Sequence, residues 1–218
     1  MVSDAFAYAK DAVIGKWMQW LLLVIATILL SIPLLGYTLK VLRGEKPAPA
    51  VDGWGTLIID GIKYFIVSLI WAIPCLIILF FGLGSLLAAV AANNLALDPG
   101  VIVAFIGGAL IYFVLFVIVA IITGLLATIG IVRFARTGSM GEAFNFGGIL
   151  ETIGKIGWGS YILAMIVLFI IQFILACIIV LIMMIPYLGF IIELVLLAPI
   201  SLFEARYICR IYDTAGAA

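Results

Sequence analysis

Residues 158–184 read WGSYILAMIVLFIIQFILACIIVLIMM, and none of them is charged. An uncharged apolar run longer than about 18 residues is typical of a membrane-spanning helix. Such runs recur along the 218-residue chain, which is 67% apolar and only 10% charged. Soluble domains are about half apolar and one quarter charged, and a chain this short cannot bury so much apolar surface in an aqueous core. The composition therefore predicts an integral membrane protein.

Five membrane spans are predicted, at residues 17–39, 64–92, 101–130, 158–184 and 187–206. The window 158–206 is too long for one span, and MIPYLGF (184–190) favours a turn because Pro186 and Gly189 interrupt helices. The alternative is a single helix kinked at the proline. NNLALDPG (93–100) is expected to close a tight hairpin between the second and third spans. The predicted fold is an all-α, five-span helical bundle.

Residues 1–16, MVSDAFAYAKDAVIGK, lack the basic start and cleavage site of a signal peptide. They predict an amphipathic helix that lies on the membrane surface and leads into the first span. Its apolar face carries Phe6, Ala9 and Val13 and continues into Trp17 and Trp20, and its polar face carries Asp4, Tyr8 and Asp11.

The basic residues predict which side of the membrane each loop occupies. If five spans alternate, nine of the eleven basic residues share one face, namely Lys40, Arg43, Lys46, Lys63, Arg133, Arg136, Lys155, Arg206 and Arg210. Only Lys10 and Lys16 lie on the other face. Because loops rich in Lys and Arg stay in the cytoplasm, we expect a multi-pass protein of the cytoplasmic membrane with its N-terminus outside and its C-terminus inside.

A shift of 93 residues without gaps aligns the loop that follows the first span with the loop that follows the third. The aligned pairs are Lys40 with Arg133, Arg43 with Arg136, Ala50 with Ala143, Asp52 with Asn145, Gly55 with Gly148, Leu57 with Leu150, Gly61 with Gly154, and Phe65 with Trp158. Each copy would be a span, a cytoplasmic amphipathic stretch and a second span. The two copies, 17–92 and 101–184, would run in parallel, and residues 187–218 would add a closing helix and a short tail.

The amphipathic stretch of each copy predicts a short interfacial helix that leads directly into a span. The residues assigned a structural role there are Asp52, Trp54, Asp60, Gly61, Lys63, Asn145, Gly154 and Trp158. Asp52 and Asn145 suit helix N-caps, and the aromatic residues suit the lipid headgroup layer.

Four basic residues at the ends of spans, Lys40, Arg43, Arg133 and Arg136, are candidates for a binding site. In one interpretation they line a cytoplasmic vestibule that binds lipid phosphate or another anion. In the other they only anchor the ends of the spans, as cytoplasmic basic residues commonly do. The sequence leaves both interpretations open.

Polar residues inside a span are functional candidates by default. Glu193 could be an ion or proton site, a neutral acid in a helix contact, or a headgroup residue. Gln172, near the middle of its span, is expected to hydrogen-bond a neighbouring helix. Glu204 and Arg206 are expected to be interfacial.

The sequence offers little support for catalysis, for a metal site or for a cofactor. There are no histidines, and the three cysteines, Cys75, Cys177 and Cys209, are far apart. No converging nucleophile, aspartate pair or metal ligand set suggests an enzyme of lipid metabolism. With a net charge of zero and no basic tract, nucleic acid is not an expected partner.

Two functions are predicted for such a protein. The first is non-enzymatic handling of lipid, another amphiphile, a solute or an ion, with membrane lipids as partners. The second is a structural or assembly role, as a homo-oligomer or as the anchor of a partner. Faces of small residues would allow close helix contacts within the chain or between subunits, and they comprise Gly82, Ser85, Ala89 and Ala92, Ala104 and Gly108, and Ala120, Gly124 and Ala127.

Short motifs carry a resemblance over most of the chain. They are GYTLKVLRG (36–44), Pro47 and Pro49, DGWG (52–55), DGIK (60–63), Pro74, RFARTG (133–138) and AF (143–144). With these motifs the chain resembles an uncharacterised family of archaeal, mainly methanogen, integral membrane proteins classed as a domain of unknown function. The resemblance implies an archaeal cytoplasmic membrane and an architecture, but no activity.

Overall fold

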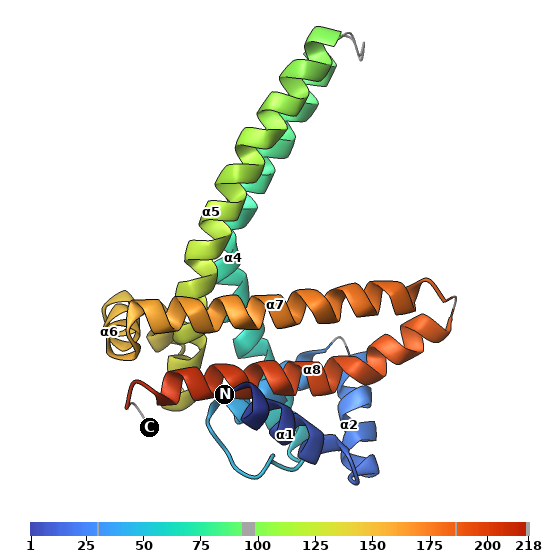
Figure 1. The fold of residues 1–218 in the computed structure, drawn as a ribbon, viewed down its shortest axis with the longest axis vertical. Coiled ribbons are helices and arrows are strands. Elements are labelled where there is room, and N and C mark those ends of the chain that lie inside the picture. The colour runs from blue at the N-terminus through green and yellow to red at the C-terminus, as the bar shows by residue number, and fades with distance from the viewer. Residues whose placement is uncertain (30, 93–98, 186, 217–218) are drawn as a thin grey trace. The chain divides into compact units, whose positions relative to one another are not determined.

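The computed structural model describes residues 1–29, 31–92, 99–185 and 187–216, and every regular element in these ranges is helical (Figure 1). The elements are α1 (Val2–Val13), α2 (Trp17–Ile28), α3 (Ile32–Leu42), α4 (Trp54–Ala92), α5 (Pro99–Thr137), the 3₁₀ helix η1 (Met140–Phe144), α6 (Phe146–Ile156), α7 (Trp158–Met183) and α8 (Leu188–Asp213). The predicted all-α membrane fold is confirmed.

Among the described residues, four helical segments are long and apolar enough to cross a membrane: Trp54–Ser85, Ile106–Thr137, Trp158–Met183 and Leu188–Asp213. They lie at the second to fifth predicted spans. The pair α1 and α2 would count as a fifth span if it crossed together, although its two helices meet at 98°. The chain is therefore a multi-pass membrane protein by the length and composition of its helices.

The first predicted span, 17–39, is not one helix. It is divided into α2 and α3, of 12 and 11 residues, and each is shorter than the ~20 residues that a crossing helix needs. Pro33 lies in the first turn of α3, where its missing N–H is tolerated. Ser31, the residue just before α3, has a left-handed backbone with φ of 59°, which no α-helix accommodates.

The predicted turn after the fourth span is present. Helix α7 ends at Met183 and α8 begins at Leu188, so the alternative of one kinked helix is wrong. Pro186, which contributed to that prediction, lies outside the described residues, as do residues 93–98 of the predicted hairpin loop.

The chain forms two compact units, and each is described by itself. One consists of Met1–Val67 with Thr128–Ala218, and the other of Ser68–Ala127. In the larger unit α8 is the central helix, because α1, α2, α3 and α7 all contact it. Figure 1 shows α7 and α8 side by side with α1 beneath α8.

Helix α1 packs along the C-terminal half of α8. Its small residues Ala5, Ala9 and Ala12 are buried, as is Val13, whereas Phe6, on the same predicted apolar face as Ala9 and Val13, is 65% exposed. The Asp4 carboxylate lies 3.1 Å from Arg206 Nε and 3.5 Å from Arg210 Nε. Small side chains allow close helix packing, and the burial of these alanines fits such a contact. The sequence assigned α1 and this end of α8 to opposite membrane faces, and these contacts bring them together.

Helix α8 contains Pro199, which cannot donate the hydrogen bond that the Val195 carbonyl would normally accept. Trp20 of α2 donates its indole N–H to that carbonyl at 3.1 Å. An unpaired carbonyl is costly in an apolar surrounding. The proline therefore creates the acceptor by which α2 is attached to α8.

Candidate functional site

The four basic candidates each have an acidic partner in the larger unit. Lys40 Nζ lies 2.8 Å from Asp52, Arg43 lies 2.6 Å from Asp60, Arg136 lies 2.7 Å from Asp213, and Arg133 pairs with Glu142. Arg136 also donates to the carbonyl of Leu42 at 3.0 Å. They act as clamps, each of which joins a helix to a loop or to another helix.

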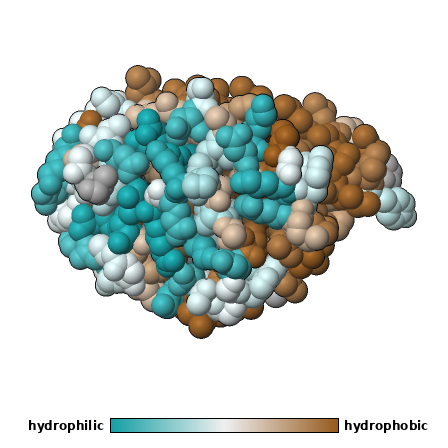
Figure 2. Space-filling model, turned by 90° about the horizontal axis from the view of Figure 1, so that it is seen from below, coloured by the Kyte–Doolittle hydropathy of each residue, from teal (hydrophilic) through white to brown (hydrophobic). Residues whose placement is uncertain are grey.

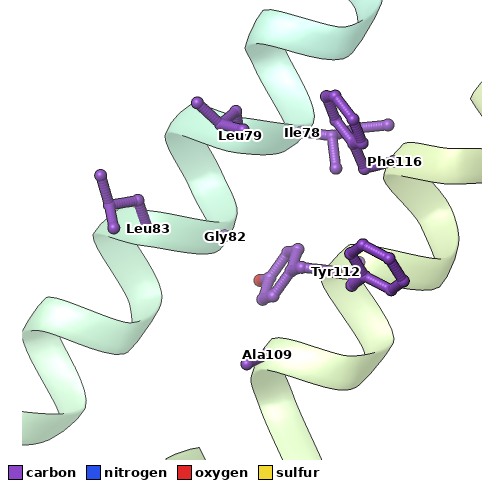
Figure 3. Close-up of a pocket in the computed structure, with 8 residues that line it drawn as sticks. Ile78, Leu79, Gly82, Leu83, Ala109, Tyr112 and Phe116 are labelled. Atoms are coloured by element: carbon purple, nitrogen blue, oxygen red, sulfur yellow. The ribbon is translucent and has the colours of Figure 1, made fainter. Parts of the chain in front are cut away.

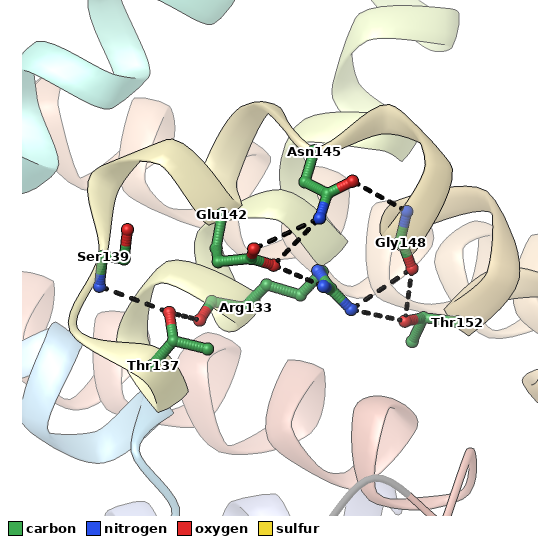
Figure 4. A network of polar contacts seen from close by, with 7 residues as sticks. All are labelled: Arg133, Thr137, Ser139, Glu142, Asn145, Gly148 and Thr152. Carbon is green, nitrogen blue, oxygen red and sulfur yellow. Dashed lines mark hydrogen bonds and ion pairs between the residues drawn. The ribbon is translucent and has the colours of Figure 1, made fainter.

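Arg133 is the centre of the largest of these clamps (Figure 4). Its Nη1 donates to the carbonyl of Gly148 and to the hydroxyl of Thr152, both at 3.3 Å. Glu142 accepts from Arg133 and from the Asn145 amide, and Asn145 Oδ1 accepts from the Gly148 N–H at 3.1 Å. Asn145 is thus the N-cap of α6. The hydrogen bond from Arg133 holds the pKa of the Glu142 carboxyl below its usual range.

In the aligned loop, Asp52 pairs with Lys40 just before α4 begins. The hydrogen bond from Lys40 holds the pKa of the Asp52 carboxyl below its usual range. Gly61 lies against α3, where a Cβ would run into the carbonyl of Ile32. Its aligned partner Gly154 faces open space.

The remaining residues predicted at the interface lie in α4 and α7. Trp54 is the first residue of α4 and is half-buried, as is Lys63 one turn after Asp60. Trp158 is the first residue of α7 and is 48% exposed.

The intramembrane candidates do not meet each other. Gln172 Nε2 donates to Glu204 Oε2 at 2.9 Å, which joins α7 to α8. Glu193 is half-buried and has no hydrogen-bond or ionic partner among the described residues. Glu204 lies nine residues before the end of α8 at Asp213, about 13 Å along the axis at 1.5 Å per residue. The sequence placed it at the interface because α8 was expected to end at residue 206.

Arg206, also expected to be interfacial, is among the most buried side chains. It is 1% exposed, with its guanidinium carbon 5.0 Å from the centre of the Tyr8 ring. Asp4 accepts from its Nε, and its Nη1 has no hydrogen-bond partner among the described residues. Sequence reasoning missed this contact because its partners are about 200 positions away.

An apolar groove of about 590 Å³ lies between α1, α7 and α8. Its walls are Val2, Phe6, Ala9, Lys10, Val13, Ile14, Ile171, Leu175, Ile178, Ile179, Leu196, Pro199, Ile200 and Phe203. Lys10 is the one charged residue in the lining, and it has no acidic partner among the described residues. In Figure 2 hydrophilic residues gather toward the ends of the chain and hydrophobic residues toward the start of α8.

The smaller unit has a second apolar pocket, of about 390 Å³, between its segments of α4 and α5 (Figure 3). The Tyr112 ring points at Gly82, and a Cβ there would lie 2.9 Å from the ring. Gly82 was predicted on a face of small residues that could pack within the chain or between subunits. In the structure it packs within the chain, against Tyr112 of the neighbouring helix. Ala89 and Ala104, from the same prediction, have side chains outside the described part of the structure.

Within the described ranges, no three Asp, Glu, Cys or His side chains come together as a metal site would require. No curated protein matches the chain, and no solved structure does. One family matches residues 20–184, and its description is "Protein of unknown function (DUF4013)". The match leaves out α1 and α8, two of the three helices that line the groove. The sequence motifs predicted a resemblance to an uncharacterised family. Because the family match covers more than half of the chain, the protein belongs to the DUF4013 family.

Proposed function

We propose that the protein is a non-enzymatic membrane protein that binds a lipid or similar amphiphile with an anionic headgroup. The groove between α1, α7 and α8 is the observation that carries this proposal. Helices α7 and α8 can cross the membrane, so the groove is within reach of lipid chains. In a bilayer every lipid offers hydrocarbon, so selectivity has to come from shape and from the headgroup.

Lys10 supplies the headgroup contact. Seven of the eleven basic residues are in ion pairs within the described structure, and Lys10 is not one of them. A lysine near anionic lipid contributes about 1 kcal/mol of attraction. The four basic candidates of the sequence are already neutralised by acids, which favours Lys10 over them as the phosphate ligand.

The C-terminus and the charged loops are proposed to lie in the cytoplasm, at the cytoplasmic membrane. The ion pairs of Asp4 with Arg206 and Arg210 favour an N-terminus on that same side, in place of the outside position expected from five spans. Four crossing helices would also return the chain to the side from which it started. Reporter fusions that are active on only one side of the membrane test this proposal, with one fusion at each terminus, and opposite locations of the two termini would refute it.

Lipid binding is tested by native mass spectrometry of the full chain from nanodiscs that contain equal amounts of an anionic phosphodiester lipid and a zwitterionic lipid. We expect retained lipid enriched in the anionic species. Ile200→Trp, which fills the groove, should abolish retention, whereas Ile166→Trp, on an exposed part of α7 outside the groove, should not.

Lys10→Gln and Lys16→Gln form a matched pair of charge removals on the N-terminal segment. Only Lys10 lines the groove, so only its loss should remove the preference for the anionic lipid. Equal retention in all variants would contradict the proposal. A defined oligomer without bound lipid would instead favour the structural or assembly role.

A further inference from the structure

Glu204 is a carboxyl group within a helix that can cross the membrane, and no basic side chain among the described residues pairs with it. Arg206, two residues later in α8, is held by Asp4 and the ring of Tyr8. The hydrogen bond that Glu204 accepts comes from a neutral amide, that of Gln172. The carboxylate is therefore without a fixed counter-charge.

An isolated carboxylate is very unfavourable in hydrocarbon, so such a group takes up a proton or is accompanied by a cation. Six other acids of the larger unit avoid this cost through arginine or lysine partners, whereas Glu193, also in α8, has no such partner among the described residues. Asp60 and Asp213, for example, each lie within 3 Å of an arginine nitrogen. Glu204 differs from these two acids because no basic side chain among the described residues neutralises it. A neutralising positive charge therefore has to come from a mobile ion.

We propose that Glu204 and Gln172 form an intramembrane site that exchanges a monovalent cation, either a proton or Na⁺. The amide of Gln172 donates from its nitrogen to Glu204 Oε2. The amide oxygen and the second carboxylate oxygen are left as ligands for the cation. Tyr64 of α4 is a titratable group close enough for electrostatic interaction with Glu204. Helix α7 contributes the uncharged Gln172. This proposal goes beyond lipid binding and does not depend on it.

The first experiment treats the full chain in nanodiscs with dicyclohexylcarbodiimide, an apolar reagent for protonated carboxyl groups. The carboxyl proton moves to a reagent nitrogen while a carboxylate oxygen bonds to the central carbon. The acyl group then shifts to nitrogen, so the whole reagent mass is added and nothing leaves. Peptide mass spectrometry locates the adduct.

We expect one adduct at Glu204, formed more slowly as the pH rises. Protection by NaCl but not by KCl at the same ionic strength would identify Na⁺ as the cation, whereas equal rates in both salts would identify the proton. Glu204→Gln should abolish the adduct and Glu193→Gln should keep it. Gln172→Leu should extend labelling to higher pH, because the carboxylate loses its donor.

Two results would overturn the proposal. One is the absence of an adduct at Glu204 under conditions that label another carboxyl group of the chain. The other is an adduct whose rate depends neither on pH nor on Na⁺, which would make Glu204 a permanently neutral acid in a helix contact.

Discussion

In the first copy of the predicted repeat, the helix after the charged loop runs unbroken from Trp54 to Ala92, whereas in the second α6 ends at Ile156 and α7 begins at Trp158. The break lies at Gly157, whose φ is 88°. The 93-residue shift aligns Gly157 with Tyr64, which lies inside α4. A residue with a Cβ disfavours positive φ and glycine does not. One aligned position thus accounts for a separate short helix in the second copy and a continuous helix in the first.

The loops before these helices also use their charges differently. Lys40 pairs directly with Asp52, whereas Arg133 reaches Glu142, and the residue aligned with Asp52 is Asn145, which caps α6. Glu142 aligns with Pro49 in the first copy, where no such carboxylate exists. The shared basic residue therefore holds each loop against a helix end, but through different acids.

The largest expected difference in stability is between alanine substitutions of two aligned glycines, Gly61 and Gly154. Gly61→Ala should destabilise the protein by about 3 kcal/mol, because the new methyl group meets a backbone carbonyl that cannot move aside. Gly154→Ala should be neutral or stabilise by up to ~1 kcal/mol, because it adds helix propensity in open space. Thermal unfolding in detergent measures both. Similar effects of the two substitutions would show that the first copy has no tighter helix contact than the second.

Removal of the two aligned basic residues should have unequal effects. Arg133→Met loses the hydrogen bonds to Gly148 and Thr152 and should cost about 2 kcal/mol. Lys40→Met should cost less, because its partner Asp52 is 74% exposed and surface ion pairs contribute little. Chemical denaturation of both variants gives the comparison, and an equal or larger loss for Lys40→Met would contradict it.

Substitution at the break itself should have a smaller effect. Gly157→Ala should cost about 1–2 kcal/mol, because alanine is strained at φ of 88°. Tyr64→Gly tests the reverse change in α4. Hydrogen exchange across 150–162 reports whether α6 and α7 have joined, and unchanged stability of Gly157→Ala would mean that glycine does not determine the break.

The smallest effect is a dependence of stability on pH. The pKa values of Asp52 and Glu142 are lowered in the folded state, so the unfolded chain binds more protons than the folded chain. Their stabilisation is complete above the usual values of 3.8 and 4.5, and it is lost as the pH falls below them. Unfolding at decreasing pH should be less acid-sensitive in Glu142→Gln than in the native chain. The same sensitivity in both would rule out this contribution.

Much of the architecture could be predicted from single segments of sequence. The apolar runs indicate where helices can cross a membrane, because a bilayer requires long uncharged segments whose backbone groups are paired internally. The turn near Gly189 was predicted for the same local reason. The division of residues 17–39 at Ser31 was not, because two short apolar helices have the same composition as one span.

The candidate site could be predicted only in part. Gln172 was expected to hydrogen-bond a neighbouring helix. That helix is α8, and the acceptor is Glu204. The basic candidates were recognised by type, but their acidic partners lie up to 77 positions away and could not be assigned. Periodicity placed Phe6 on one apolar face with Ala9 and Val13, but it could not indicate that those two are buried while Phe6 is 65% exposed.

Composition, span length and membrane character thus followed from the sequence by itself, because each depends on the interaction of one segment with lipid or water. Only the tertiary structure decided that Arg206 is buried against Asp4 and Tyr8, that Trp20 binds the carbonyl left free by Pro199, and that three helices enclose a groove. These features depend on side chains that are distant in sequence and meet only when the helices pack. Local pattern contains no information on such pairings.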